Sequence, residues 1–428
     1  MEINFFLLIL VGICAFLLVK KRTEMINVLY IILMAIPIGS TNILLDKLDV
    51  IVIKGIGLNL IHFIIGILAL ISLKDILAKM REKKYISYGI IGILLLILIS
   101  LVIGFINDNS IIQDGQKFLM FLIWGCVIWS QMYDRSSVDK FIYITIIAIN
   151  INFCLNILLN IMRPITEQLL IADIGKMSEE SGFVSYAANI SLVTIAFSLY
   201  YLLNRKMQKK ESIIFVANLV LSALNNIIFA GNRTYMILMI ALVVIVAFSS
   251  DMVRKQYKKN KYKVFVVTAM SFLVLVVALL TNDTMMRKIT NAIQNGVDIN
   301  LVTRGKTISY YMKEIIVAPF GYGFGKPLPL INQFGRFHGS SLFTDNAFLN
   351  VGMKIGLIGL IVFIAAIVYI IKRSIVCNRK IVTITYVAFL ISGALMTGQI
   401  FNNYPMSFFF IAFSILCIKG ENKEHKKV

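Results

Sequence analysis

The sequence has few charged residues for its length. Only 15% of its 428 residues are Asp, Glu, Lys or Arg, whereas 59% are hydrophobic. Too few polar side chains remain to cover the surface of a soluble domain of this size. The composition therefore excludes a soluble globular protein and predicts a polytopic membrane protein.

Cysteine and histidine are also scarce. No two cysteines form a CxxC pair, and no two histidines stand in the HExxH pattern of a zinc enzyme. The five cysteines lie in hydrophobic runs or in a basic loop, at Cys14, Cys126, Cys154, Cys377 and Cys417. We therefore expect neither a disulfide framework nor a metal site.

Acidic residues are few as well, 22 against 42 basic ones, which gives a net charge of +20. In a soluble protein this charge would suggest nucleic acid as a partner. Here lysine and arginine gather in alternate loops: seven basic segments hold 28 of them, whereas the short segments between hold six. This bias predicts that the basic segments are cytoplasmic and contact membrane lipids rather than nucleic acid, with the N-terminus outside and the C-terminus inside.

Thirteen hydrophobic runs are candidates for membrane spans of about 17 to 25 residues each. The fold class we expect is all-α, a polytopic membrane helix bundle of about 13 transmembrane helices. The expected spans are residues 3–19, 25–41, 55–73, 87–106, 118–133, 141–162, 183–203, 213–230, 234–250, 264–281, 356–371, 381–398 and 404–418. The first is followed by Lys20-Lys21-Arg22 without a cleavage motif, so we interpret it as a retained span.

The long segment 282–355 is the only long stretch too polar to lie in a membrane. It divides the chain into transmembrane helices 1–10 (residues 1–281), a large extracytoplasmic loop (282–355), and helices 11–13 with a basic cytoplasmic tail (356–428). Any chemistry that needs water and several polar side chains is expected in this loop.

An amphipathic helix is predicted inside the loop, over residues 304–317. Apolar residues recur there at spacings of three and four, at Ile308, Tyr311, Met312, Ile315 and Ile316. Thr303 is a plausible N-cap, and Pro319 follows the end of the helix. A further helix is predicted to begin at Asp345 or Asn346.

Two arginines are candidate anion-binding residues. Arg233 lies between two apolar runs at the predicted outer boundary, where the charge bias disfavours a cation. A guanidinium there suits phosphate oxygens, although an arginine at a span end can also simply reach toward water. Arg304 opens the predicted amphipathic helix, where the helix dipole also favours an anion. Alternatively, Arg304 is an ordinary helix residue whose side chain is exposed to water.

Asp345, Asn346 and His338 are the other candidates in the loop. Asp345 could act as a general base or orient a sugar hydroxyl, but Asp or Asn before an apolar helical run is also the commonest N-cap. His338 is the only histidine in the segment and could serve as a base, whereas a lone loop histidine usually does not.

Three alternating glycines, Gly321, Gly323 and Gly325, precede Lys326 and imitate a phosphate loop. They lack the GxxxxGK[ST] spacing and a preceding strand. A turn that leads the amphipathic helix back to the membrane is therefore the favoured role, because glycine permits left-handed backbone.

Together these motifs resemble the O-antigen polymerase and O-antigen ligase superfamily of bacterial membrane glycosyltransferases. The matching pieces are Gly231-Asn232-Arg233 opening a span, Arg304 in a helix that runs to Ala318-Pro319-Phe320-Gly321-Tyr322-Gly323-Phe324-Gly325, and Asp345-Asn346-Ala347-Phe348-Leu349 leading into an apolar helix. Ligases usually have histidine where Asp345 stands, which favours a polymerase. The segment Glu179-Glu180-Ser181-Gly182-Phe183 lacks the arginine that the family often has before a mid-chain span.

The resemblance implies an enzyme that joins oligosaccharide repeat units carried on polyprenyl diphosphate, at the outer face of the bacterial cytoplasmic (inner) membrane, without metal or other cofactor. Arg233 and Arg304 would bind the donor diphosphate, Arg304 and Asp345 would act in catalysis, and Asn346 and His338 would support them. The product would be O-antigen or capsule, and a chain-length regulator is an expected partner. The alternatives are a ligase-type transferase of the same fold and a flippase for the same lipid-linked units.

Overall fold

The structure of the protein is a computed structural model. The described residues are 2–3, 27, 30–31, 34–35, 49–53, 56–132, 138–161, 187–205, 208–224, 233–249, 299–332, 334–377, 380–395, 399–402 and 404–418. The predicted spans at 3–19, 25–41 and 264–281 lie largely or wholly outside these residues. The predicted number of thirteen spans therefore stays a prediction.

The described chain is mostly helical, as the sequence predicts. Its helices are α4 (Leu60–Glu82), α5 (Lys84–Ile106), α6 (Ile111–Met132), α7 (Val138–Ile161), α9 (Ala187–Asn204), α10 (Lys209–Leu224), α11 (Arg233–Ser249), α15 (Ile299–Val317), α16 (Ala347–Val376), α17 (Lys380–Phe389), α18 (Gln399–Asn402) and α19 (Tyr404–Ile418), with a π-helical turn, η2, at Leu390–Leu395. Three of them, α5, the first 21 residues of α7, and α16, are long and apolar enough to cross a membrane.

One predicted span begins differently in the structure. Residues 55–73 were expected to be helical, but Ile56–Asn59 forms strand β3, which pairs with β2 (Asp49–Ile53), and helix α4 follows. Strand β2 also pairs with the short strand β1 (Glu2–Ile3). The β-branched run Val50-Ile51-Val52-Ile53 favours extended backbone in β2, and Ile56–Asn59 is extended where it pairs with that strand.

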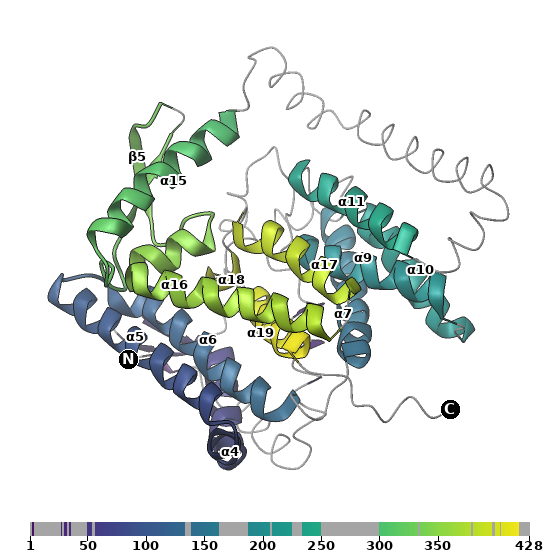
Figure 1. Ribbon diagram of the computed structural model, residues 1–428, viewed down its shortest axis with the longest axis horizontal. Helices are drawn as coiled ribbons and strands as arrows, with labels where there is room; N and C mark the ends of the chain where they lie inside the picture. Colours follow the sequence, from purple (N-terminus) through teal and green to yellow (C-terminus); the bar gives the residue numbers. More distant parts are fainter. Residues whose placement is uncertain are drawn as a thin grey trace.

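The membrane helices pack in two groups (Figure 1). Helices α7, α9, α10, α11 and α17 contact one another, and α6 packs with α4, α5 and α19 beside α16. Aromatic rings fill the second group, where Phe118 stacks on Phe401 and Trp124 lies against Phe408. These apolar contacts hold α16 in place along α5 and α19.

Helix α15 and a two-stranded hairpin form a lobe beyond one end of α16 (Figure 1). The strands are β4 (Leu328–Ile331) and β5 (Phe337–Ser341), which pair antiparallel with a bulge at His338. Tyr311 and Ile315 of α15 are fully buried against the start of α16, and Gly352 lets Ile315 approach closely. The lobe therefore packs firmly on α16.

Helix α16 is broken at Gly356, whose φ of 89° is not helical. The backbone groups released by the break are bonded elsewhere: Met353 O accepts from Tyr322 N (2.9 Å), Lys354 O accepts from Ser100 Oγ (2.8 Å), and Ile358 N donates to Pro319 O (3.3 Å). Residues 347–355 thus form a short, buried helix that precedes the long apolar one. Non-helical backbone in a membrane protein is tolerated where protein satisfies it in this way.

Candidate functional site

The alternating glycines form the joint between the lobe and the membrane helices. Gly321, Gly323 and Gly325 all have left-handed backbone, with φ of 76°, 79° and 80°. A Cβ at Gly323 would lie 2.2 Å from Gly104 N, and one at Gly325 would lie 2.4 Å from Ser110 C. The glycines are required both for their conformation and for the close approach of two backbones.

The backbone amides of this joint are already bonded within the protein. Gly321 N donates to Ala318 O, Phe324 N to Ser100 O, and Gly325 N to Asp114 Oδ1 at 2.6 Å. These amides are not available to cradle a phosphate. The structure therefore confirms that the glycine run is a turn and not a phosphate loop.

Replacing Gly323 with alanine is expected to remove most folded protein from the membrane. The methyl group would overlap the Gly104 backbone and force an unfavourable φ, at a cost of about 3 kcal/mol or more. Extraction yield and thermal unfolding of the purified protein measure the effect. Gly305→Ala is the control: Gly305 lies inside α15 with open space around it, so alanine should be tolerated or stabilising. Equal yields of the two variants would contradict the assigned role of Gly323.

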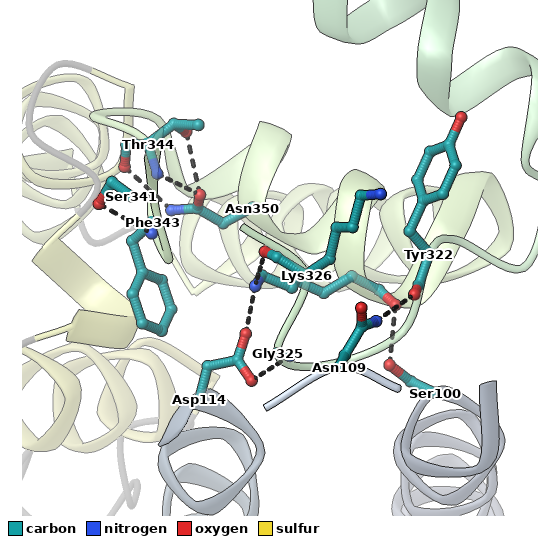
Figure 2. A network of polar contacts seen from close by, with 11 residues as sticks. Ser100, Asn109, Asp114, Tyr322, Gly325, Lys326, Ser341, Phe343, Thr344 and Asn350 are labelled. Atoms are coloured by element: carbon teal, nitrogen blue, oxygen red, sulfur yellow. Dashed lines mark hydrogen bonds and ion pairs between the residues drawn. The ribbon is translucent and has the colours of Figure 1, made fainter. Parts of the chain in front are cut away.

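A buried ion pair lies beneath the glycine run (Figure 2). Lys354 of α16 pairs with Asp114 of α6, and both side chains are 0% exposed. Lys354 Nζ also donates to Lys326 O (2.9 Å), while Asp114 accepts from Gly325 N. Two charges that are removed from water need such partners, so the pair holds α6, α16 and the glycine run in one arrangement.

Tyr322 links the same run to the lobe and to the loop that follows α5. Its carbonyl accepts from Asn109 Nδ2 at 3.0 Å (Figure 2), and its hydroxyl donates to Glu314 of α15 at 2.5 Å. This hydrogen bond to a carboxylate raises the pKa of Tyr322 to about 12, so the phenol stays protonated at neutral pH and keeps donating. The glycine run is therefore hydrogen-bonded both to α15 of the lobe and to the loop that carries Asn109.

Asn346 is the N-cap of α16. Its side-chain oxygen accepts from Phe348 N (2.9 Å) and Leu349 N (3.2 Å). Preceding it, Thr344 is held by the buried Asn350, whose side chain accepts from Thr344 N (2.7 Å) and donates to Thr344 O (3.1 Å), as Figure 2 shows. These bonds fix the loop on either side of Asp345.

Asp345 is therefore not needed as a cap. Its side chain is exposed between the fixed neighbours Thr344 and Asn346. Nearby protein atoms nevertheless partly desolvate the Asp345 carboxyl and raise its pKa, and the positive charge of Arg304 opposes that rise. Asp345 and Arg304, from two different elements, thus lie within electrostatic reach of each other.

Arg304 is half-buried, but its predicted position at a helix start is wrong. Helix α15 begins at Ile299, so Thr303 is inside the helix and not its N-cap. The carbonyl of Thr303 accepts from Thr307 Oγ1 at 2.8 Å, an interaction within the helix. Arg304 therefore has no support from the free amides of a helix N-terminus.

The structure does not test the roles of the other two candidates, Arg233 and His338. Arg233 is the first residue of α11, as predicted, but its side chain lies outside the described residues. His338 is exposed in β5, and within the described part of the chain its side chain makes no hydrogen bond or ion pair. Both roles stay predictions.

Sequence reasoning missed Asp114 and Lys354. Asp114 was placed before the span that was expected at 118–133, whereas α6 begins at Ile111. Lys354 was counted with the polar loop, although it lies among the buried residues of α16. The available signal was a single lysine between the apolar residues Met353 and Ile355, since such a charge is costly unless it is paired.

Comparison with known families supports the resemblance seen in the sequence. Residues 217–364 match the family model described as O-antigen ligase, within the O-antigen ligase and polymerase superfamily. The match includes α15, the glycine run, Asp345 and the start of α16, and it also includes Arg233. No curated protein matches the chain. The matched region and the apolar helices together indicate a membrane protein of polysaccharide synthesis with a glycosyltransferase-like activity.

Proposed function

We propose that the protein is a bacterial polysaccharide polymerase that joins oligosaccharide repeat units carried on polyprenyl diphosphate. The lobe of α15 and the hairpin would face the outer side of the cytoplasmic membrane, with the N-terminus outside and the C-terminus inside, as the distribution of lysine and arginine favours.

One observation carries this proposal: the matched region brings a cation and a carboxylate together at the end of α16. Arg304 is half-buried, and its charge acts on Asp345. The carboxylate is held by a capped helix and by the network of Thr344 and Asn350. A carboxylate that is held in place within electrostatic reach of a guanidinium suits glycosyl transfer from a diphosphate.

The reaction uses these groups as follows. A hydroxyl of the acceptor sugar attacks the anomeric carbon of the donor, and its proton passes to the Asp345 carboxylate. The bond between the anomeric carbon and oxygen breaks, and the electron pair leaves with the polyprenyl diphosphate. Arg304, together with Arg233, stabilises the charge that develops on this leaving group more than the charge of the ground state.

The apolar outer stripe of α15 supports a substrate that lies in the membrane surface. Ile308, Met312 and Ile316 are 44%, 36% and 63% exposed and recur every four residues along one side of the helix. An amphipathic helix of this kind lies in the interfacial layer of a bilayer. It would therefore sit at the depth where the diphosphate of a lipid-linked sugar is found.

A ligase-type transferase is the second candidate, because the matched family model is described as O-antigen ligase. Against it, Asp345 stands where ligases usually have histidine. A flippase would need polar groups along a path through the membrane. The polar candidates Arg304 and Asp345 instead gather at one end of α16, which favours an enzyme.

Arg304→Ala tests the proposal in a strain that lacks the native gene. The deletion strain should accumulate single repeat units, wild-type protein should restore the long ladder of surface glycan, and Arg304→Ala should not, because the leaving group loses its cation. Arg233→Ala is expected to behave like Arg304→Ala. Lys306→Ala, an exposed cation on the same helix, is the control and should restore the ladder.

Gels of surface glycan and of extracted lipid-linked glycan distinguish the candidates. Long glycan stranded on the lipid carrier in the deletion strain would identify a ligase. Unpolymerised units trapped at the cytoplasmic face would identify a flippase. A normal ladder from both arginine variants would contradict the proposed mechanism.

A further inference from the structure

One side of the lobe carries two aromatic rings beside a carboxylate. Phe337 of β5 packs edge-on against Tyr310 of α15, with ring centres 5.3 Å apart, and 61% of Phe337 is exposed. Glu314 follows Tyr310 by one turn of α15 and is half-buried. Phe337, Tyr310 and Glu314 therefore form one continuous surface, which we call the Tyr310 surface.

The Tyr310 surface lies on the side of α15 opposite the apolar stripe. Tyr310 and Glu314 are four residues apart and so share one side of the helix. Met312, in the middle of the stripe, is two residues from each of them, which places it about 160° away around the helix axis. A helix that lies with this stripe in the bilayer surface turns the Tyr310 surface toward water. The ligand that fits there is therefore a water-soluble group and not a lipid tail.

The exposed ring of Phe337 is held in place by the hairpin. The side-chain oxygen of Asn332 accepts from Phe334 N (3.0 Å) and Arg336 N (2.9 Å), which fixes the turn just before Phe337. The ring itself rests on Tyr310. An aromatic side chain that is already fixed loses little conformational freedom when it binds a ligand.

The carboxylate of Glu314 is available for further hydrogen bonds. One of its oxygens accepts from the Tyr322 hydroxyl at 2.5 Å, and in the described part of the chain Glu314 forms no ion pair. Partial desolvation raises the pKa of Tyr310, and the charge of Glu314 adds to the rise, so the phenol beside the carboxylate stays protonated. The surface thus offers a carboxylate acceptor and a hydroxyl next to each other.

These groups match the two sides of a sugar. The C–H face of a sugar ring is apolar and packs on an aromatic ring such as Phe337, while its hydroxyls donate to a carboxylate such as Glu314. The ammonium of Lys326 lies 5.5 Å from the centre of the Tyr322 ring and offsets the negative charge of Glu314. A surface with little net charge favours a sugar over a strongly charged macromolecule.

The Tyr310 surface lies at a fixed distance from the candidate site, because both are on α15. Arg304 comes six residues before Tyr310 and ten before Glu314, which corresponds to about 9 Å and about 15 Å along the helix axis. We propose that the Tyr310 surface is a second binding site of the lobe, which holds the glycan of the reaction at sugars beyond the reacting one. The identity of this glycan rests on the proposed function.

The experiment measures binding of two probes to the purified full-length protein by calorimetry. One probe is the long surface glycan of the wild-type strain, and the other is the glycan that mild acid releases from the lipid carrier of the deletion strain. Phe337→Ala should weaken binding about fivefold or more, because the sugar loses its apolar partner. Glu314→Gln should weaken it about tenfold, because an amide oxygen accepts hydrogen bonds less strongly than a carboxylate.

Two control variants accompany these. Tyr85→Ala also removes an exposed aromatic ring, but at the end of α5 far from the lobe, and should bind normally. Tyr322→Phe removes the hydrogen bond to Glu314 and keeps the carboxylate. It should lower the thermal unfolding temperature as much as Glu314→Gln does, yet bind glycan normally, which separates sugar binding from a structural role of Glu314.

The two probes also show which glycan the surface holds. Tighter binding of the long glycan than of a single repeat unit would support the inference and assign the surface to the growing chain. Equal binding of the two would support it and assign the surface to the incoming unit.

Three results would overturn the inference: no binding of either probe by the wild-type protein, normal binding by Phe337→Ala or by Glu314→Gln, or equal loss of binding in Tyr322→Phe and Glu314→Gln. The assay needs no glycosyl transfer, so it fails independently of the proposed function. If gels of the deletion strain identified a ligase or a flippase while glycan binding still depended on Phe337 and Glu314, only the polymerase would be refuted.

Discussion

Asp345→Asn is expected to abolish glycan polymerisation while the protein stays folded in the membrane. An amide cannot accept the proton of the acceptor hydroxyl, and it gives no negative charge to orient that hydroxyl. Loss of a general base lowers the rate by roughly 10² to 10⁴. The check is the rate of polymer formation by purified protein at matched concentration, together with its thermal unfolding.

Asn346→Asp is the matched control, since it makes the converse change at the next residue. Aspartate is as good an N-cap as asparagine, so α16 should keep its start and the variant should keep polymerising. The two variants separate a carboxylate needed for chemistry from a residue needed for capping. Wild-type rates in Asp345→Asn would remove the base from the mechanism and leave Arg304 as the main catalytic group.

The pH profile offers a second check on Asp345. Partial desolvation by nearby protein atoms raises the pKa of this carboxyl, with the charge of Arg304 opposing the rise. A general base must be deprotonated, so the rate should fall as the pH drops through that raised pKa, at a pH above the usual range near 4. A residual rate in Asp345→Asn that shows no acid limb would support the assignment to Asp345. A rate that stays constant down to about pH 4 would contradict it.

The helical fold was predictable because a bilayer requires hydrophobic runs long enough to span it and favours basic residues in the loops on its cytoplasmic side. The expected spans at 87–106, 141–162 and 404–418 correspond closely to α5, α7 and α19. The predictions were wrong where the structure extends a helix beyond its predicted start or replaces a predicted helical segment with a strand. Helix α15 begins five residues before Arg304, and Ile56–Asn59 pairs as a strand instead of beginning a helix.

The candidate site could be predicted only in part, since proximity of residues far apart in the sequence is set by packing. The roles of Asp345 and Asn346 stayed open in the sequence because both are good caps. The geometry assigns the cap to Asn346, with its side chain on two backbone amides. Asp114 is not visible as a site residue from sequence, because its significance depends on Lys354 and Gly325, which meet it only in the folded chain.

The buried pair of Asp114 and Lys354 should give the largest effect on stability. Lys354→Met is expected to destabilise the protein by about 3 to 5 kcal/mol, because the Asp114 carboxylate is left in the protein interior without its counter-charge. Asp114→Asn should have a similar effect, since it leaves the ammonium of Lys354 unpaired. Thermal unfolding and the yield of membrane-extracted protein measure both.

The double variant Asp114→Asn with Lys354→Met should recover most of the lost stability. Neither residue then carries a charge, and the asparagine oxygen still accepts from Gly325 N. Replacement of both members of a buried pair by neutral residues is often nearly neutral in stability. A coupling free energy of about 3 kcal/mol or more between the two sites is therefore expected.

Polymer formation by the double variant then shows what the pair does beyond stability. Lys354 also donates to Lys326 O and holds the glycine run, a bond that methionine cannot make. We expect the recovered double variant to polymerise more slowly than wild type at saturating donor, because the lobe with Arg304 is no longer fixed to α16 at this point. If the double variant were as unstable as the single ones, the pair would not act as a unit. If it polymerised at the wild-type rate, the ion pair would serve folding alone.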